Sequence, residues 1–460
     1  MVMSFPRKRE STTRVSGSVP AKAGTKAFGD DKNFSSRPFS FDPVSRRGGQ
    51  AAKISVRPAQ TQPCHPFLPP FSNQLQKVAV FWLFLGLGFI YPARGIYADE
   101  VVRIAVLQDS PSFYLRVKGA FEIQDEFGRP VYKGKNFKNR LIKADSERII
   151  LPGTVLNLAR LKIFSKSGYI YINNRLYRGR VSIIPKDTTR FLVVNELDLE
   201  NYLRGILCNE IAPWWPLDAL KAQAVVARTY ALYQRQFSKN KDFDLTNDIY
   251  SQVYGGRTSE KWRANRAVDL TKGEILTFKG NLFPAYYHAA CGGHTEDASI
   301  LWKDDLEPLK GVICGFCAGS PHFRWQAEIS LEEMKSKLLA KGFKIDRLDQ
   351  IEIVSLNPSG RVNELEIKNA DNSLVISAKD FRQALGPNLI RSTNFTLKII
   401  SDKVYFAGLG WGHGVGLCQW GMYGLAKSGK NYKEILEYYY PKSEIVNLSK
   451  GLYPINSSAK

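Results

Sequence analysis

A glutamate followed by apolar and aromatic side chains is the first feature of this sequence that could do chemistry. Glu210 lies in the segment CNEIAPWWP, where Ile211, Trp214 and Trp215 could surround its carboxyl group. Apolar surroundings raise the pKa of a carboxylic acid, so that it can donate a proton near neutral pH. The alternative role is structural, because an acidic residue just ahead of a helix often caps its first turn.

The glycine-rich segment GWGHGVGLCQWG at residues 410–421 is a second candidate. Glycine at alternate positions allows unusual backbone angles and the close approach of a ligand. The side chains left to act are His413, Gln419, Trp411 and Trp420. His413 can titrate near neutral pH, Gln419 can donate and accept hydrogen bonds, and either tryptophan offers a large aromatic face to a ligand. A tightly packed turn with a buried histidine is the alternative.

Cysteine and histidine side chains in the middle of the chain have the spacing of a metal site. Cys314 and Cys317 form a CxxC pair, and Cys291 precedes them. Three thiolates and one imidazole, from His288 or His294, would make a closed, structural zinc site. The alternative for an exported protein is a Cys314–Cys317 disulfide with Cys291 free.

Weaker candidates flank these segments. Lys221 and Arg228 share one face of the helix expected after Glu210, where they could bind a carboxylate, tune the glutamate or form structural ion pairs. Cys208 and Cys418 lie inside the two candidate catalytic segments, and a disulfide between them is a further alternative.

The elements that must position these side chains form an α+β body, rich in strands with a few helices. Apolar and polar residues alternate between residues 101 and 194, as in antiparallel strands. Residues 216–232 change to helical spacing, with alanines along one apolar stripe. Shorter elements are expected as strands at 273–290 and 348–400 and as helices at 330–342 and 432–440.

Composition divides the chain into regions and excludes several classes. Hydrophobic residues make up 44% of the 460 residues and charged residues 23%, which excludes collagen-like and wholly disordered chains. The net charge of +22 suits an anionic partner, but no nucleic-acid module is present. The predicted regions are a basic, disordered extension at 1–77, a signal peptide or anchor at 78–98, a β-rich part at 99–195, a catalytic core at 196–445 and a tail at 446–460.

The apolar run at residues 78–91 predicts export. It is uncharged, and about 14 apolar residues suit a signal peptide better than a membrane span. An uncleaved anchor is the alternative. Either way, residues 99–460 are expected outside the cytoplasm, in the periplasm, the cell envelope or the medium, with membrane contact only through the N-terminal segment.

Four segments in this order resemble the SpoIID/LytB family, that is, stage II sporulation protein D and the amidase enhancer. They are residues 195–232 (NELDLENYLRG through VVARTYAL), YGG at 254–256, FPAYYHAACGGHTEDASILW at 283–302, and residues 408–441 (GLGWGHGVGLCQWG through EYYYP). The resemblance runs from roughly residue 100 to 445. It implies a SpoIID-like fold and an exported protein that works on peptidoglycan.

The resemblance also implies an activity and assigns roles. The sporulation member is a lytic transglycosylase, which cuts peptide-free glycan between N-acetylmuramic acid and N-acetylglucosamine and leaves a 1,6-anhydro end. Glu210 matches the family's catalytic glutamate. The family usually has serine where Cys418 stands, so no special role is expected for this cysteine. The expected site residues are Glu210, His413 and Gln419 for catalysis, Lys221, Arg228, Tyr287, His288, Trp411 and Trp420 for substrate, and Cys291, His294, Cys314 and Cys317 for zinc.

Two other functions remain open from the sequence. The first is a non-catalytic glycan-binding protein that enhances an N-acetylmuramoyl-L-alanine amidase, which needs the cleft but no acid. The second is a zinc-stabilised surface protein without glycan affinity.

Overall fold

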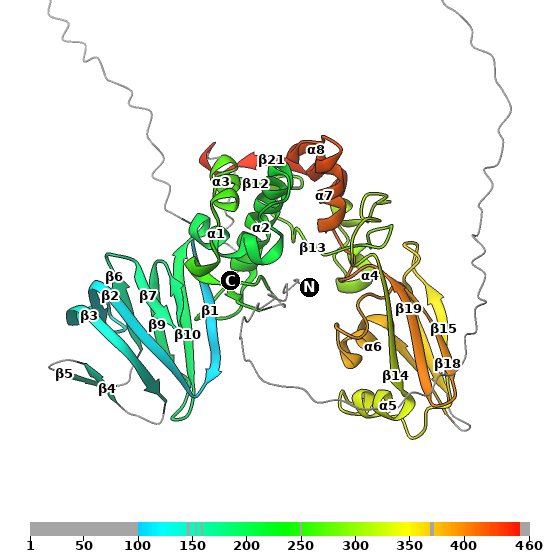
Figure 1. Cartoon of the computed structure of the whole chain (residues 1–460), viewed down its shortest axis with the longest axis horizontal. Coiled ribbons are helices and arrows are strands. Elements are labelled where there is room, and N and C mark those ends of the chain that lie inside the picture. Colours follow the sequence, from blue (N-terminus) through cyan, green and yellow to red (C-terminus); the bar gives the residue numbers. More distant parts are fainter. Residues whose placement is uncertain are drawn as a thin grey trace, which may run out of the picture. The chain divides into compact units, whose positions relative to one another are not determined.

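The computed structural model describes residues 100–144, 148–151, 154–157, 160–248, 251–368 and 372–450 (Figure 1). The expected extension at 1–77, the expected signal or anchor at 78–98, and residues 451–460 lie outside this part. Within it are eight α-helices and 21 strands, so the predicted α+β class is confirmed. No helix among these residues is long and apolar enough to cross a membrane.

A nine-stranded, mostly antiparallel sheet opens the described body and follows the predicted alternation. In β2, Phe113, Leu115 and Val117 are buried and the residues between them are more exposed, as in a sheet with one face on a core. The strands are β1 Val101–Ser110, β2 Ser112–Gln124, β3 Pro130–Lys143, β6 Leu161–Ser165, β7 Tyr169–Ile172, β8 Arg175–Tyr177, β9 Arg180–Pro185, β10 Phe191–Asp198 and β11 Leu245–Thr246. A separate hairpin pairs β4 Arg148–Leu151 with β5 Thr154–Asn157.

Helices α1 and α2 follow β10 and form the framework for the candidate site. Asp198 caps α1 by accepting a hydrogen bond from the backbone N–H of Asn201. The alanine stripe predicted for α2 is completely buried, which lets neighbouring elements approach closely. The helices of this part are α1 Leu199–Glu210, α2 Leu217–Phe237, α3 Trp262–Leu270, α4 Ala298–Trp302, α7 Gln419–Lys427 and α8 Tyr432–Tyr439.

Two short strand pairs connect segments that lie far apart in the sequence to the part of the fold around α1 and α2. The parallel pair of β13 (Tyr287–His288) and β20 (Leu417–Cys418) aligns Tyr287 with Leu417 and His288 with Cys418. The antiparallel pair of β12 (Glu274–Thr277) and β21 (Glu444–Asn447) includes the first residues of the expected tail. The first pair therefore joins two of the segments in which chemistry was expected.

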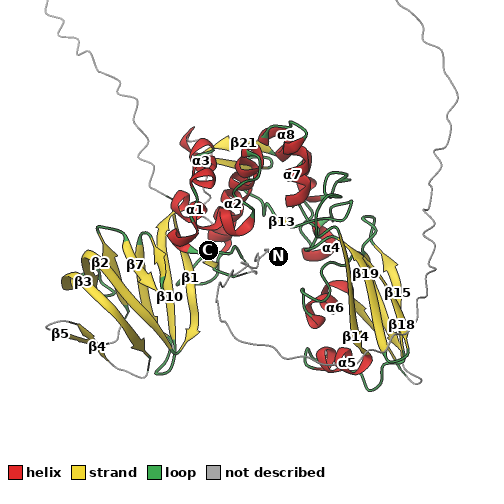
Figure 2. Ribbon diagram, viewed as in Figure 1, coloured by secondary structure: helices red, strands yellow, loops and turns green. Residues whose placement is uncertain are grey.

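A second hydrophobic core lies between Trp325 and Phe406, within the region that the sequence had predicted as one catalytic core. It is built by two three-stranded sheets and two helices (Figure 2). The elements are β14 Arg324–Ser330, β18 Phe395–Ile400 and β19 Lys403–Leu409 in one sheet, β15 Gln350–Leu356, β16 Val362–Lys368 and β17 Ser373–Ser377 in the other, and helices α5 Leu331–Leu339 and α6 Ala378–Leu385. The predicted helix at 330–342 is α5.

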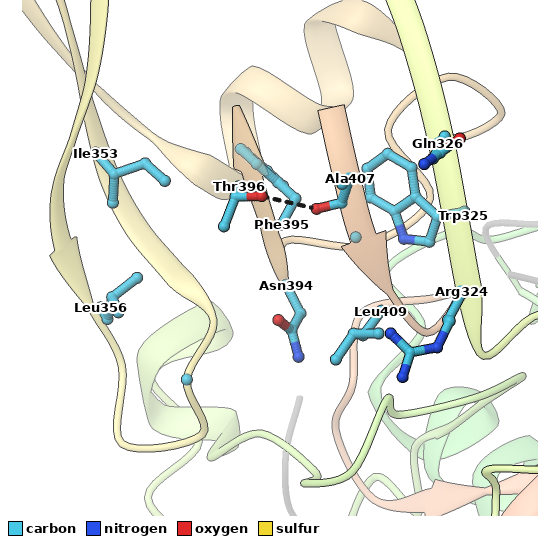
Figure 3. A pocket seen from close by; sticks show the side chains of 12 residues that line it. Arg324, Trp325, Gln326, Ile353, Leu356, Asn394, Phe395, Thr396, Ala407 and Leu409 are labelled. Atoms are coloured by element: carbon cyan, nitrogen blue, oxygen red, sulfur yellow. Dashed lines mark hydrogen bonds between the residues drawn. The ribbon is translucent and has the colours of Figure 1, made fainter. Parts of the chain in front are cut away.

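A pocket of about 680 Å³ lies in this second core, between β15 and the sheet of β18, β19 and β14 (Figure 3). Ile353 and Leu356 line one side, and Phe395 and Trp325 line the other. Arg324 is its one ionisable lining residue. Acid–base chemistry needs a proton donor and acceptor, so this pocket is not a candidate catalytic site.

Candidate active site and thiol cluster

Glu210 is the last residue of α1 and is 2% exposed. The alternative that it caps the following helix is wrong, because Pro216 holds the N-cap position of α2. Of the three apolar neighbours expected around it, Ile211 and Trp215 are buried in the main core, but Trp214 is 70% exposed. The carboxyl group is therefore buried by the fold as a whole more than by the paired tryptophans.

The two oxygens of the Glu210 carboxyl group have different surroundings. Oε1 accepts a hydrogen bond from the backbone N–H of Val253 at 3.1 Å, and the nearby hydroxyl of Tyr287 favours the charged form of the carboxyl group. Oε2 is buried and has no hydrogen-bond partner. Because Oε1 already accepts a hydrogen bond, the proton of the neutral carboxyl group belongs on Oε2, the oxygen without a partner.

A directed chain of hydrogen bonds runs from Tyr202 through Gln252 to the Tyr287 hydroxyl. The hydroxyl of Tyr202 donates to Oε1 of Gln252 at 2.9 Å, and Nε2 of Gln252 donates to the Tyr287 oxygen at 3.2 Å. Because the Tyr287 oxygen already accepts this bond, its own proton is free to point at the glutamate. Tyr202, Gln252 and Tyr287 are all buried.

Burial raises the pKa of Glu210 from 4.5 to about 7, although the hydrogen bond from Val253 and the nearby Tyr287 hydroxyl favour the charged form. The group therefore holds its proton near neutral pH, as a general acid must. This was the property expected from the sequence, and the structure traces it to desolvation.

We expect this raised pKa to make folding stability fall as pH rises from about 4.5 to 7. Over that range the unfolded carboxyl has lost its proton and the folded one has kept it, so each step in pH favours unfolding. A shift from 4.5 to about 7 corresponds to about 3 kcal/mol. Urea unfolding of the wild type and of Glu210→Gln at several pH values tests this. The variant should lack the decline, and equal declines in both proteins would refute the assignment.

His413 is held by the backbone on both ring nitrogens. Its Nε2 donates to the Tyr287 carbonyl at 3.0 Å, and Nδ1 accepts from the Val415 N–H at 3.1 Å. Burial, with a contribution from His288, lowers its pKa well below the usual value. The sequence analysis expected a catalytic residue here. Both nitrogens are committed, so His413 holds the Tyr287 backbone in place.

His288 is also buried, and burial with the nearby charge of Arg361 lowers its pKa to about 3. Nδ1 donates to the Val415 carbonyl at 3.1 Å, which leaves Nε2 as a lone-pair acceptor without a partner. Of the two histidines, His288 is thus the one with an open hydrogen-bonding position.

Gln419 begins α7 and is 2% exposed. Its Nε2 lies 3.4 Å from Oε1 of Gln223 on α2, and Nε2 of Gln223 has no partner. Gln419 lies two residues after Leu417, which pairs with Tyr287. The strand pair and the Gln419–Gln223 contact thus connect the glycine-rich segment to the framework around Glu210.

The two tryptophans expected to stack on sugar are partly buried against other side chains. Trp420 packs on Trp215, with ring centroids 5.2 Å apart. Trp411 lies 4.8 Å from His322 and 4.8 Å from the guanidinium of Arg391. Both indole N–H groups are buried without a partner. These rings pack within the protein, so they do not offer the open faces that the sequence analysis expected.

The prediction that Arg228 binds substrate is wrong. The side chain is fully buried, pairs with Glu200 at 2.7 Å and donates to the Glu274 carbonyl at 2.9 Å. The other basic candidate, Lys221, lies 3.5 Å from Asp218 and 5.3 Å from the ring centre of Tyr432. The ion-pair alternative therefore fits both.

Replacing Arg228 with methionine should lower the free energy of unfolding by about 3 kcal/mol, because it leaves Glu200 without its buried partner. Arg204→Met is the matched control, since Arg204 pairs with Asp269 near the surface, and this change should stay below about 1 kcal/mol. Urea denaturation measures both. A loss for Arg228→Met no larger than for the control would show that the pair is not structural.

Four buried cysteines form one cluster: Cys291, Cys314, Cys317 and Cys418. Their sulfur atoms all lie within 4.8 Å of one another. Three were expected there, but the expected fourth ligand, His294, is not in the cluster. Its Nδ1 bonds to the Thr295 carbonyl at 2.6 Å, and the parallel pair of β13 and β20 delivers Cys418 to that place instead.

The disulfide alternatives do not describe this structure. Cys208 and the four clustered cysteines are all free thiols. Four thiols converging on one point have the ligand types and number of a closed tetrahedral metal site. The donor set fits a zinc ion.

Arg361 supplies an independent test of that fit. Its guanidinium is fully buried, and Nη2 donates to the Cys291 carbonyl at 2.5 Å. Nε and Nη1 have no hydrogen-bond partner, and the charge faces Cys291, Glu296, Cys418 and Cys317. A buried cation is unfavourable unless nearby negative charge compensates it. Glu296 supplies one such charge, and thiolates, the form of cysteine that binds metal, would add to it.

Arg361 belongs to the turn between β15 and β16, so the second core reaches the thiol cluster through this turn. In the same turn, Asn357 and Ser359 each donate to Oε2 of Glu296 at 2.8 Å. A Cβ atom at Gly414 would lie 2.6 Å from the Arg361 guanidinium carbon, at a φ of +91°. Glycine is therefore required at this position of the glycine-rich segment.

Comparison with known proteins identifies the family to which the chain belongs. Residues 187–278 match the model of the SpoIID family, stage II sporulation protein, and residues 309–416 match a domain of unknown function, DUF8618. The chain belongs to the SpoIID family. An uncharacterised protein of Brachyspira hyodysenteriae is 34% identical over 78% of this chain and 96% of its own length.

Relatives with functional names are more distant. Stage II sporulation protein D of Bacillus subtilis is 29% identical over 57% of this chain and 78% of its own. The amidase enhancer of the same organism is 26% identical over 53% of this chain, and the match covers 40% of that protein.

Several residues of the site were missed in the sequence. Gln223 carried a signal, because it interrupts the alanine-rich face of α2 with a buried amide. Gln252 lies just before the YGG motif and also carries a buried amide. Tyr202 lies in the segment 195–232, but nothing distinguished it there from a core tyrosine, and Arg361 lies outside the segments where chemistry was expected.

Proposed function

We propose that this protein is a peptidoglycan lytic transglycosylase in which Glu210 is both the acid and the base. The observation that carries the proposal is the buried carboxyl group with one anchored and one unpartnered oxygen, whose burial raises its pKa to about 7. Family membership supports the substrate class. The expected apolar segment at 78–91 supports action outside the cytoplasm.

One carboxyl group is enough for this reaction. Glu210 gives its proton to the glycosidic oxygen as the bond from that oxygen to C1 of N-acetylmuramic acid breaks. The C6 hydroxyl of the same sugar then bonds to C1, and its proton returns to the carboxylate. No water is consumed, and Glu210 ends in its starting form. The Val253 N–H and the Tyr287 hydroxyl stabilise the carboxylate between the two steps.

We propose that the four-thiol cluster holds a structural zinc ion. A closed set of four protein ligands leaves no position for substrate, so the metal would stabilise the fold without entering the reaction. Cys418 belongs to β20, where it pairs with His288, and Cys291 follows β13 by three residues. The ion would therefore fix the strands that carry Tyr287 and His288.

A second candidate function is stimulation of a cell-wall amidase without catalysis. The relative named amidase enhancer supports it. That function needs glycan or amidase binding, but no residue with a raised pKa.

Peptide-free glycan strands discriminate between these functions. The purified protein is incubated with the strands, and the products are analysed by liquid chromatography and mass spectrometry. New 1,6-anhydro-muramic ends, absent with Glu210→Gln, support the transglycosylase. Retention on the strands without products supports the amidase-enhancing role, and neither retention nor products would leave a surface protein with no glycan function.

A further inference from the structure

Two tryptophans are exposed on the surface of the family core. Trp214 is 70% exposed and Trp262 is 69% exposed, whereas every other tryptophan in the described residues is buried or partly buried. Tryptophan is usually well buried in a folded protein. Both side chains are thus accessible enough to stack on a ligand.

Arg263 contacts the backbone on either side of Trp214 and the ring of Trp262. Its Nε donates to the carbonyl of Pro213 at 3.0 Å and its Nη2 to the carbonyl of Trp215 at 3.1 Å, the residues on either side of Trp214. Its guanidinium carbon also lies 5.7 Å from the ring centre of Trp262. The turn between α1 and α2 and the start of α3 thus meet at one guanidinium group.

The surface around the two rings is basic. Lys261 is exposed beside Trp262, and exposed Arg266 lies one helical turn further along α3, on the same face as Trp262. Arg266 forms no salt bridge with any residue that the structure describes.

This combination matches a polysaccharide that carries carboxylates. The apolar faces of pyranose rings can stack on indoles, and the lactyl carboxylates of peptide-free N-acetylmuramic acid would pair with the lysine and arginines. Trp214 lies four residues after Glu210 along the chain, so a strand bound here lies next to the segment that carries the acid.

We propose that Trp214 and Trp262, with Arg263 and Arg266, form a glycan-binding surface that holds the strand outside the residues that perform the cleavage. The inference rests on the proposed function for its ligand. The proposed surface binds glycan and takes no part in the proton transfers assigned to Glu210.

Binding is measured in a Glu210→Gln background, which prevents turnover. Sedimentation with peptide-free glycan strands gives the dissociation constant for that protein and for the added changes Trp214→Ala, Trp262→Ala and both together. The double change should weaken binding about tenfold or more, and each single change less. Phe127→Ala is the matched control, because Phe127 is 74% exposed on the turn between β2 and β3, and it should bind as the parent does.

The outcomes separate this inference from the proposed function. Binding by the double variant equal to that of the Phe127→Ala control would overturn the inference. Normal glycan binding with loss of amidase binding would also overturn it and make the surface a protein interface. Loss of binding in the tryptophan variants supports the inference even if the wild type makes no anhydro ends, a result that would remove the transglycosylase alone.

Discussion

Glu210→Gln is expected to lower the rate of glycan cleavage by about 10³-fold or more and to leave the fold intact. General acid–base catalysis contributes about 10²- to 10⁴-fold, and here one group performs both proton transfers. Glutamine keeps the shape of the side chain, and its oxygen can still accept the bond from Val253. It has no proton of suitable acidity at the Oε2 position. The measurement is the initial rate of anhydro-end formation, with circular dichroism to check folding.

Glu274→Gln is the matched control for this experiment. Oε2 of Glu274 is also buried without a partner, and Oε1 accepts from the Tyr432 hydroxyl, so the same chemical change is made at a second buried carboxyl group. Activity should stay within a few-fold of wild type. Undiminished cleavage by Glu210→Gln would remove this residue from the mechanism, and equal losses in both variants would point to a general effect of the substitution.

Cys418→Ser should release the metal and destabilise the protein by at least about 3 kcal/mol. Structural zinc provides about 10–16 kcal/mol of folding free energy in small zinc-binding peptides, and serine is a poor fourth ligand for a set of thiolates. Metal content by mass spectrometry should be close to one zinc per wild-type chain and much lower in the variant. Urea unfolding gives the change in stability, and a chelator added to the wild type should reproduce it.

Cys208→Ser provides the control, because Cys208 is half-buried and lies outside the cluster. It should keep its zinc and lose little stability. If the purified wild type holds no metal and the two variants unfold alike, the cluster is not a metal site. A wild-type mass lower by two hydrogens per disulfide would likewise identify the thiols as oxidised pairs.

The sequence predicted those parts of the molecule that depend on local pattern. Alternation across residues 101–194 predicted the first sheet, and the alanine spacing predicted α2, because burial of one face repeats at a fixed interval in strands and helices. The raised pKa of Glu210 followed in the same way from its apolar neighbours. Its cause was only partly predicted, since Trp214 turns outward and the pKa is raised by burial within the fold as a whole.

The missed features all depend on pairings between segments distant in the chain. Cys418 replaces His294 at the thiol cluster because β20 lies beside β13, and no local spacing encodes that register. Whether a basic residue meets substrate or a buried acid depends on what packs against its helix, which for Arg228 is Glu200. His413 has the expected chemistry, but the backbone around it takes both nitrogens.

The near-complete burial of the Glu210 carboxyl group also has a kinetic consequence. A sugar linkage can reach an acid that is 2% exposed only while the surrounding side chains are displaced. The apparent affinity for a cleavable strand is then the intrinsic affinity reduced by the fraction of time spent open. Under the proposed function, such an enzyme would cleave little glycan until a ligand that favours the open form raised that fraction.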